Sequence, residues 1–180
     1  MNLSPIPNFA YQQNILTSGK SKGMSTSIGA SLPDNVLEKL IFSRENRENS
    51  VVFLLTVDQN EFPHVALLSP YQVVAQNHEK IFLLVYRKSR SQVLLRSRGR
   101  CTLIFQDLPS VLYIVLNAKR VNSWEENDEA LYSASIVDVS MDYSEKSPLI
   151  SDLRFQEEHV RDHYQHSFGM LKAHIERLQP

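Results

Sequence analysis

Basic and hydroxyl-bearing side chains are concentrated in one stretch, residues 86–100, which reads YRKSRSQVLLRSRGR. This stretch carries six of the nineteen Lys and Arg residues of the chain and no acidic residue. Ser89 and Gln92 have the S-x-x-Q spacing of a capping box, which begins a helix, and Gly99 stands where a C-terminal cap is expected. The pattern predicts a short helix that starts at Ser89. Its buried side is expected to consist of Val93 and Leu94.

The start of this helix has the features of an anion-binding site. The first turn of a helix presents N–H groups without partners, together with the positive end of the helix dipole. Lys88 and Arg90 add two cationic side chains there, and Ser91 adds a hydroxyl donor. We therefore expect a phosphate dianion at this turn; the alternative is a solvent-facing helix with surplus charge. The basic residues at the far end are assigned no ligand: Arg96, Arg98 and Arg100.

Histidines form a second pattern near the C-terminus. His159, His163 and His166 are spaced by four and then three residues, and His174 follows on the same face of a predicted helix. Such spacing can place two imidazoles on one metal ion. Charged neighbours surround the row, and it runs beside the apolar stripe of the helix, which favours a polar helix edge. We expect no metal site and name no catalytic residue. The tyrosines are expected to pack in the core or at an interface: Tyr113, Tyr132, Tyr143 and Tyr164.

Strands must position most of these side chains. Runs of β-branched and large apolar residues, separated by short polar turns, predict a hairpin and further strands. The run SVLYIVLNAKRV is almost continuously apolar, which indicates a strand buried on both faces. The predicted strands are 51–57, 62–69, 72–75, 80–86, 100–106, 110–121 and 131–143.

Helices are predicted toward both ends of the chain. The segment SLPDNVLEKLIF begins with Ser31, has Pro33 in its first turn and Asp34 at the capping-box position. From Leu153 onward, apolar residues lie on one helical stripe, which predicts a helix of about five turns. The fold class is therefore mainly β (α+β), an antiparallel barrel of six or more strands with flanking helices. Residues 1–30 are predicted to be a flexible arm and 31–180 a single domain.

Composition limits the classes of partner. The chain has 180 residues, 42% hydrophobic and 22% charged, and a formal net charge of −1. Such a balance gives no general attraction to nucleic acid or anionic membranes. No apolar stretch is long enough to span a bilayer. The single Cys101 lies in an apolar run, where burial is expected, and these features together favour a cytoplasmic setting.

A resemblance to a known family links these observations. The segment HVALLS, the strand IFLLVY, the S-R-S that opens a helix and the strand RCTLIF follow one another as in the pyridoxamine 5′-phosphate oxidase-like proteins. These are FMN-binding split β-barrels, so the resemblance implies that fold and FMN as cofactor. It covers about residues 34–120 well and the remainder more loosely.

The resemblance also implies which residues hold the flavin. The family's S-R-K, which grips the phosphate, matches Ser89, Arg90 and Ser91, and we expect Lys88 to replace the missing Lys. The segment that passes beside the ribityl chain and ring matches Leu84, Val85 and Tyr86. The strand that lines the flavin, R-x-V-L-L-K in the family, matches His64, Val65, Ala66, Leu67, Leu68 and Ser69, where both charged positions are replaced. Family sites lie between two subunits, which implies a homodimer.

The expected activity is that of an FMN-dependent oxidoreductase whose substrate is unknown, with NADH or NADPH as the possible electron donor. Pyridoxamine phosphate oxidation itself is not expected, because the C-terminal Trp and the Arg-x-His signature of those enzymes are missing. The alternative is a non-enzymatic dimeric module that holds FMN or heme. A nucleic-acid-binding barrel is a weaker alternative, since no aromatic residues are interleaved with the basic ones. The pattern does not separate FMN from a deazaflavin.

Overall fold

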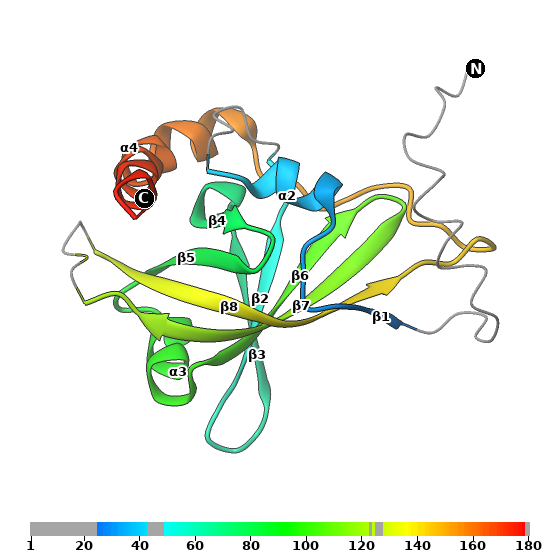
Figure 1. Ribbon diagram of the computed structural model, residues 1–180, viewed down its shortest axis with the longest axis horizontal. Helices are drawn as coiled ribbons and strands as arrows, with labels where there is room; N and C mark the ends of the chain where they lie inside the picture. The colour runs from blue at the N-terminus through cyan, green and yellow to red at the C-terminus, as the bar shows by residue number, and fades with distance from the viewer. Residues whose placement is uncertain (1–24, 43–48, 123, 125–127, 179–180) are drawn as a thin grey trace.

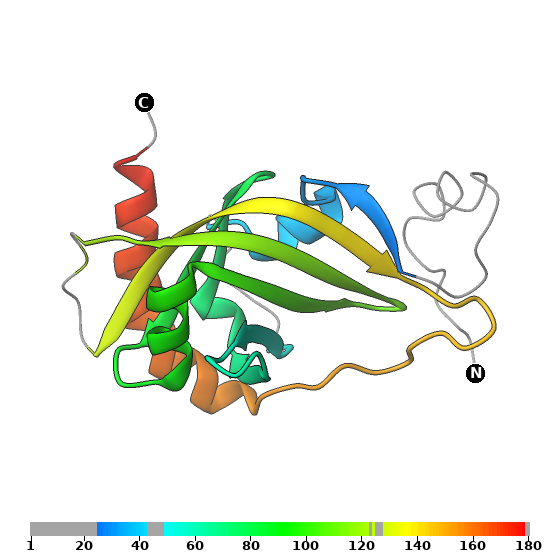
Figure 2. The same cartoon turned by 90° about the horizontal axis from the view of Figure 1, so that it is seen from below.

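Eight antiparallel strands form one strongly curved sheet in the computed structural model (Figures 1 and 2). The structure describes residues 25–42, 49–122, 124 and 128–178, and only the backbone of 157–162. The sheet order is β3-β2-β6-β7-β8-β5-β4, and β1 pairs with β8. The strands are β1 (Thr26–Gly29), β2 (Val52–Val57), β3 (Pro63–Leu68), β4 (Val73–Asn77), β5 (Lys80–Tyr86), β6 (Arg100–Asp107), β7 (Ser110–Arg120) and β8 (Glu129–Asp142).

The core is formed by every second residue of the strands, because successive side chains point to opposite faces of the sheet. On β7, Leu112, Ile114 and Leu116 point into the barrel, where they meet inward-facing residues of β2, β5, β6 and β8. Cys101 on β6 belongs to this core, as predicted, and burial raises the pKa of its thiol to about 12. The predicted mainly β split barrel with flanking helices is confirmed.

Helices cover parts of this barrel. They are α2 (Asp34–Leu40), a 3-10 turn η1 (Pro70–Gln72), α3 (Arg90–Arg98) and α4 (Glu157–Glu176). In the view of Figure 1, α4 lies above strands β5 and β8, and α3 lies below them. α4 buries Phe168, Leu171 and Ile175 against Phe82 and Leu84 of β5. This contact forms a second apolar cluster on the outer side of the sheet.

The N-terminal part departs from the prediction in two ways. Pro33, whose side chain offers no acceptor, is the N-cap residue of α2, so the capping box expected from Ser31 and Asp34 does not form. Thr26–Gly29, the end of the predicted arm, is the strand β1, because its backbone pairs with β8. Residues 1–24 of that arm lie outside the described residues.

The structure also bears on the predictions for the C-terminal helix and for strand β7. A helix is expected from Leu153, but α4 begins at Glu157. The backbone of Leu153 instead accepts a hydrogen bond from the N–H of Val51 and donates one to the side chain of Gln106. Strand β7 is buried on one face only; Val115, for example, is 37% exposed. The described residues of the chain leave its outer face uncovered, and burial of that face between two subunits stays a prediction. In the described part of the chain no helix is long and apolar enough to cross a membrane.

Candidate functional site

The predicted helix start is present. Ser89 is the N-cap of α3, and its Oγ accepts a hydrogen bond from the backbone N–H of Gln92 at 3.1 Å. Gly99 ends the helix in the left-handed conformation, with φ of 62°, as a C-terminal glycine does. Arg90 and Ser91 occupy the first turn, so their N–H groups have no acceptor within the helix. Two amide donors without a partner in the helix therefore lie where the phosphate is expected.

The buried side of α3 differs from the prediction at one residue. Leu94 and Leu95 are buried, whereas Val93 is 57% exposed. Ser91 and Gln92 take the place expected for Val93, and both are buried. The helix therefore packs two polar side chains, those of Ser91 and Gln92, against the barrel, and Ser91 lies against β3.

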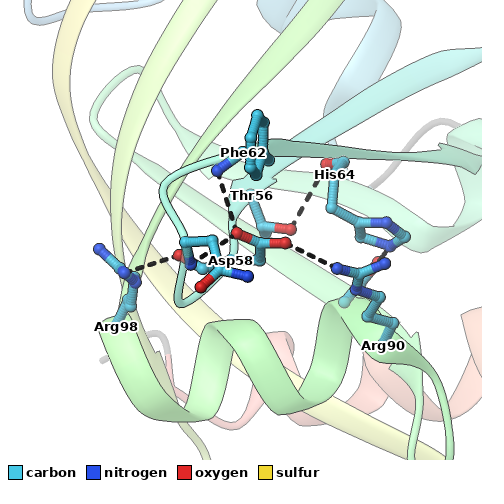
Figure 3. Close-up of polar contacts among 8 residues, drawn as sticks. Thr56, Asp58, Phe62, His64, Arg90 and Arg98 are labelled. Atoms are coloured by element: carbon cyan, nitrogen blue, oxygen red, sulfur yellow. Dashed lines mark hydrogen bonds and ion pairs between the residues drawn. The ribbon is translucent and has the colours of Figure 1, made fainter.

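A carboxylate of the β2–β3 turn lies beside Arg90 (Figure 3). Nη2 of Arg90 donates to Oδ2 of Asp58 at 2.8 Å. Oδ1 of the same carboxylate accepts from the backbone N–H groups of Asn60 and Phe62, at 2.9 and 3.0 Å. The Asp58 side chain is only 14% exposed. The two hydrogen bonds from the backbone of the turn hold its carboxylate in place. The guanidinium that the sequence assigns to a phosphate thus already has an anionic partner.

The far end of α3 is tied to the same turn. Nη2 of Arg98 donates to the backbone oxygen of Asp58 at 2.6 Å. Sequence reasoning assigned Arg98 no ligand and treated residues 58–61 only as a turn. The available signal was the acidic residue at the first position of that turn, where a side chain commonly accepts from the backbone two residues later. Arg90 and Arg98 together hold the turn along the length of α3 (Figure 3).

Two predicted site residues from different elements meet at the start of α3. Nε2 of His64, on β3, lies 3.3 Å from Oγ of Ser91. Ser91 is 3% exposed and His64 is half-buried. The backbone oxygen of His64 also accepts from the hydroxyl of Thr56 at 3.4 Å, as Figure 3 shows. The structure therefore brings together the strand and the helix that the resemblance assigned to one site.

The other site residues predicted in 65–69 point alternately to the two faces of the sheet. Val65 and Leu67 point outward and are 51% and 50% exposed. Ala66 packs against the core, and Leu68 is buried in it. Ser69 is buried because it caps η1, with its Oγ accepting from the N–H of Tyr71 at 3.1 Å. Only the outward pair offers apolar surface to a ligand.

The end of β5 contributes one accessible side chain. Leu84 and Val85 are buried on opposite faces of the strand, whereas Tyr86 is exposed. The Tyr86 hydroxyl lies 2.6 Å from Nε2 of His163 and 3.2 Å from the hydroxyl of Tyr164. Tyr86 therefore points toward α4, while Arg90, four residues later, points toward the β2–β3 turn. Ser89, the N-cap of α3, stands between Tyr86 and Arg90 in the sequence. Lys88 is exposed there.

Burial changes the pKa of Tyr164, the tyrosine of α4 that contacts Tyr86. Burial first, then the hydrogen bond with Tyr86, raises the pKa of Tyr164 far above its ordinary value. The nearby carboxylate of Glu129 contributes in the same direction. Glu129 is itself buried, and its Oε2 has no hydrogen-bond partner within the described residues. Tyr164 is thus a neutral hydrogen-bonding group and not a ready proton donor. Tyr132 is buried in the core, as predicted.

The histidine row is divided among different environments. His163 contacts Tyr86, whereas His174 lies edge-on against the rings of Phe82 and Trp124. Burial, with a smaller effect of Arg177, lowers the pKa of His174. The side chain of His159 lies outside the described residues. Among the described side chains, no group of three His, Cys, Asp or Glu residues is arranged to hold a metal ion.

Comparisons with known proteins agree with this architecture. No protein-family model and no curated protein matches the chain. Among solved structures, a candidate pyridoxamine 5′-phosphate oxidase of Lactobacillus delbrueckii superposes with a TM-score of 0.50 at 16% identity. The match covers 66% of this chain and 98% of that protein.

Two further solved structures are less similar. A variant of HupZ from Group A Streptococcus gives a TM-score of 0.48 at 9% identity, over 59% of this chain and 96% of that one. The conserved hypothetical protein Rv2991 of Mycobacterium tuberculosis gives 0.47 at 14% identity, over 66% and 90%. At these identities the likeness concerns the fold alone. The chain has the split β-barrel fold of the pyridoxamine 5′-phosphate oxidase-like proteins.

Proposed function

We propose that the protein binds FMN, with the phosphate at the first turn of α3, and that it is an FMN-dependent oxidoreductase. The observation that carries the proposal is the convergence of three groups at one helix start. The N–H groups of Arg90 and Ser91 are free of helical partners. The guanidinium of Arg90 stands beside them, and the Ser91 hydroxyl contacts His64 of the neighbouring strand. Amide donors with a guanidinium suit a phosphate dianion.

The Asp58 carboxylate limits how the phosphate fits. A phosphate on Arg90 either shares the guanidinium with Asp58 or displaces it, since Arg has five N–H donors and the Asp58 contact uses one nitrogen. Asp58 stays in place because Asn60 and Phe62 hold its other oxygen. We therefore infer shared binding, with an affinity below that of a site without the carboxylate.

An apolar outer face of the sheet supports a place for the flavin ring and for a second subunit. Cross-strand partners align there in two rows across β3, β2, β6 and β7, which are Leu67-Phe53-Ile104-Tyr113 and Val65-Leu55-Thr102-Val115. Partners in register point to the same side of a sheet, and the alternate residues fill the core. We propose that a second copy of the chain covers this face and that the ring lies beside Val65 and Leu67 at its edge.

When bound, FMN supplies the electron-transfer chemistry, and the protein binds and orients it. We assign no residue to a proton transfer. NADH or NADPH is the proposed electron donor, and a cytoplasmic location is proposed from the single, buried cysteine.

Replacement of Arg90 tests the site. The affinity of purified protein for FMN is measured by quenching of flavin fluorescence for wild type, Arg90→Ala and Arg96→Ala. Arg96, at the other end of the helix, is exposed and provides the matched control. We expect Arg90→Ala to weaken binding about tenfold or more, as for a lost charge-assisted contact, and Arg96→Ala to leave it unchanged. Equal affinities for all three proteins would remove Arg90 from the site.

A non-enzymatic module of the same fold is the second candidate function. It is favoured by the carboxylate beside Arg90 and by the presence of His64 and Ser69 at the positions where the family has Arg and Lys. The exposed Tyr86–His163 pair also has the ligand types that hold heme iron. Anaerobic mixing with NADH or NADPH separates the two: bleaching of the flavin band supports the oxidoreductase, and a persistent band supports the module. A Soret band that His163→Ala abolishes would identify heme as the ligand.

A further inference from the structure

The outer face of strands β5, β8 and β7 carries a groove that the flavin proposal does not use. Its volume is about 630 Å³, within the usual range for a small-molecule site. The residues that line it are Ala30, Asn77, Glu79, Lys80, Asn117, Lys119, Ser133, Ser135 and Ile136. None of them belongs to the start of α3 or to β3. The groove is therefore separate from the proposed phosphate site.

The strand register explains why polar side chains gather there. Lys80 and Asn117 both pair with Ser135, and Lys119 pairs with Ser133. These residues share one face, whereas the intervening residues Ile81, Ala118 and Ala134 point into the core. The floor of the groove thus carries three neutral polar groups, with a lysine on each side of the central strand.

The two lysines stand at a separation that suits one shared anion. They lie on strands either side of β8 and are offset by two residues along the strands. Strand spacings place their Cα atoms about 12 Å apart, a gap that two extended lysine side chains can close from both ends. Neither lysine belongs to an ion pair among the described residues. Lys80 instead lies 5.7 Å from the ring centre of Phe82.

The lining also determines what kind of molecule suits the groove. Glu79 is the one acidic lining residue, so two lysines leave a net charge of +1. This favours a ligand with one anionic group over a polyanion. The hydroxyls and amides of the floor match ligand hydroxyls, and the apolar lining is limited to Ala30 and Ile136.

We propose that this groove binds a small hydroxylated molecule carrying one phosphate or carboxylate group, with Lys80 and Lys119 holding the anion and Asn117, Ser133 and Ser135 the hydroxyls. The connection between β1 and α2, which includes Ala30, forms one wall, and the turn from Asn77 to Glu79 forms another. The proposal does not depend on flavin binding, because the two sites share no residue.

Ribose 5-phosphate is the probe, with ribose and inorganic phosphate as partial probes. Binding to the full chain is followed by amide NMR shifts, with and without saturating FMN. We expect shifts at residues 117–119 and 133–135, and a lower affinity for either partial probe. The Lys80→Gln/Lys119→Gln double variant should bind at least about tenfold more weakly, while Glu79→Gln should bind about two- to threefold more tightly.

Lys146→Gln is the matched control, since Lys146 is exposed and lies outside the groove, and it should bind as wild type does. Unchanged melting temperatures of the variants show that they are folded. The proposal is overturned if the probe shifts only residues 89–91, if FMN abolishes its binding, if no binding is detected, or if the double lysine variant binds as wild type does.

Discussion

The carboxylate of Asp58 lies 2.8 Å from the guanidinium of Arg90, so the cation assigned to a phosphate already faces an anion of the same chain. This contact joins the β2–β3 turn to the first turn of α3. Arg98 adds a bond to the same residue from the other end of the helix. The turn and the helix therefore act as one unit, and the charge of Asp58 enters the electrostatics of any anion that binds there.

Removal of that charge should strengthen FMN binding. Asp58→Asn keeps an oxygen that can accept from Asn60 and Phe62 but removes the negative charge beside the phosphate. We expect FMN to bind about three- to tenfold more tightly, measured by fluorescence quenching. Stability should change by less than about 1 kcal/mol, because the Arg90 side chain of this pair is largely exposed. Glu61→Gln, in the same turn, is the charge-matched control. A weaker affinity for Asp58→Asn would mean that Asp58 positions Arg90 and does not compete.

Gly99 should tolerate no side chain without loss of stability. Its φ of 62° is left-handed, and a Cβ atom there would lie 3.1 Å from the backbone oxygen of Ala118. We expect Gly99→Ala to lower the free energy of unfolding by about 1–2 kcal/mol in urea titrations. Gly169→Ala is the matched control, since Gly169 lies within α4 with open space around it. That variant should gain about 0.5–1 kcal/mol. Equal effects of both variants would contradict this account.

The buried Cys101 thiol should make stability depend on pH at alkaline values. Its pKa rises from 9.0 to about 12 on folding because burial disfavours the thiolate. As the pH rises, the thiol loses its proton in the unfolded chain before it does so in the folded protein. The stabilisation that the buried thiol contributes is therefore complete below pH 9 and is lost between about pH 9 and 12. The loss is about 1.4 kcal/mol per pH unit within that window.

Comparison with Cys101→Ala isolates this effect, because other groups titrate equally in both proteins. The difference in unfolding free energy between wild type and variant should shrink as pH rises from 9. A thiol reagent at pH 8 should also react with unfolded protein and spare the folded one. Rapid labelling of native protein would show that Cys101 is accessible.

A charge on the outer sheet face should disrupt the proposed homodimer. Val115 lies in one of the two apolar rows that cross β3, β2, β6 and β7. Val115→Glu would bury an unpaired charge between subunits, and we expect the dimer to dissociate at least about tenfold more readily in analytical ultracentrifugation. Val93→Glu, on the exposed side of α3, is the control, and the mass of the sedimenting species should be the same as for wild type. A monomeric wild type would refute the proposed dimer.

Much of this protein follows from local pattern alone. Alternation of apolar residues located the strands, and Ser89 with Gly99 bounded α3, because capping depends on residues only a few positions apart. The burial of Cys101 followed from its apolar neighbours. These features are determined by short-range stereochemistry, which each segment of the sequence carries by itself.

Tertiary structure decided which groups meet. Asp58 and Arg90 are 32 residues apart, and no spacing rule connects them; the packing of α3 against the β2–β3 hairpin does. The same holds for the Tyr86–His163 contact and for the two lysines of the groove, which the strand order places either side of β8. The outer face of β7 looked buried in the sequence because an apolar run does not record what covers it. Charge partners and face exposure depend on contacts distant in sequence, and these arise only when the barrel closes.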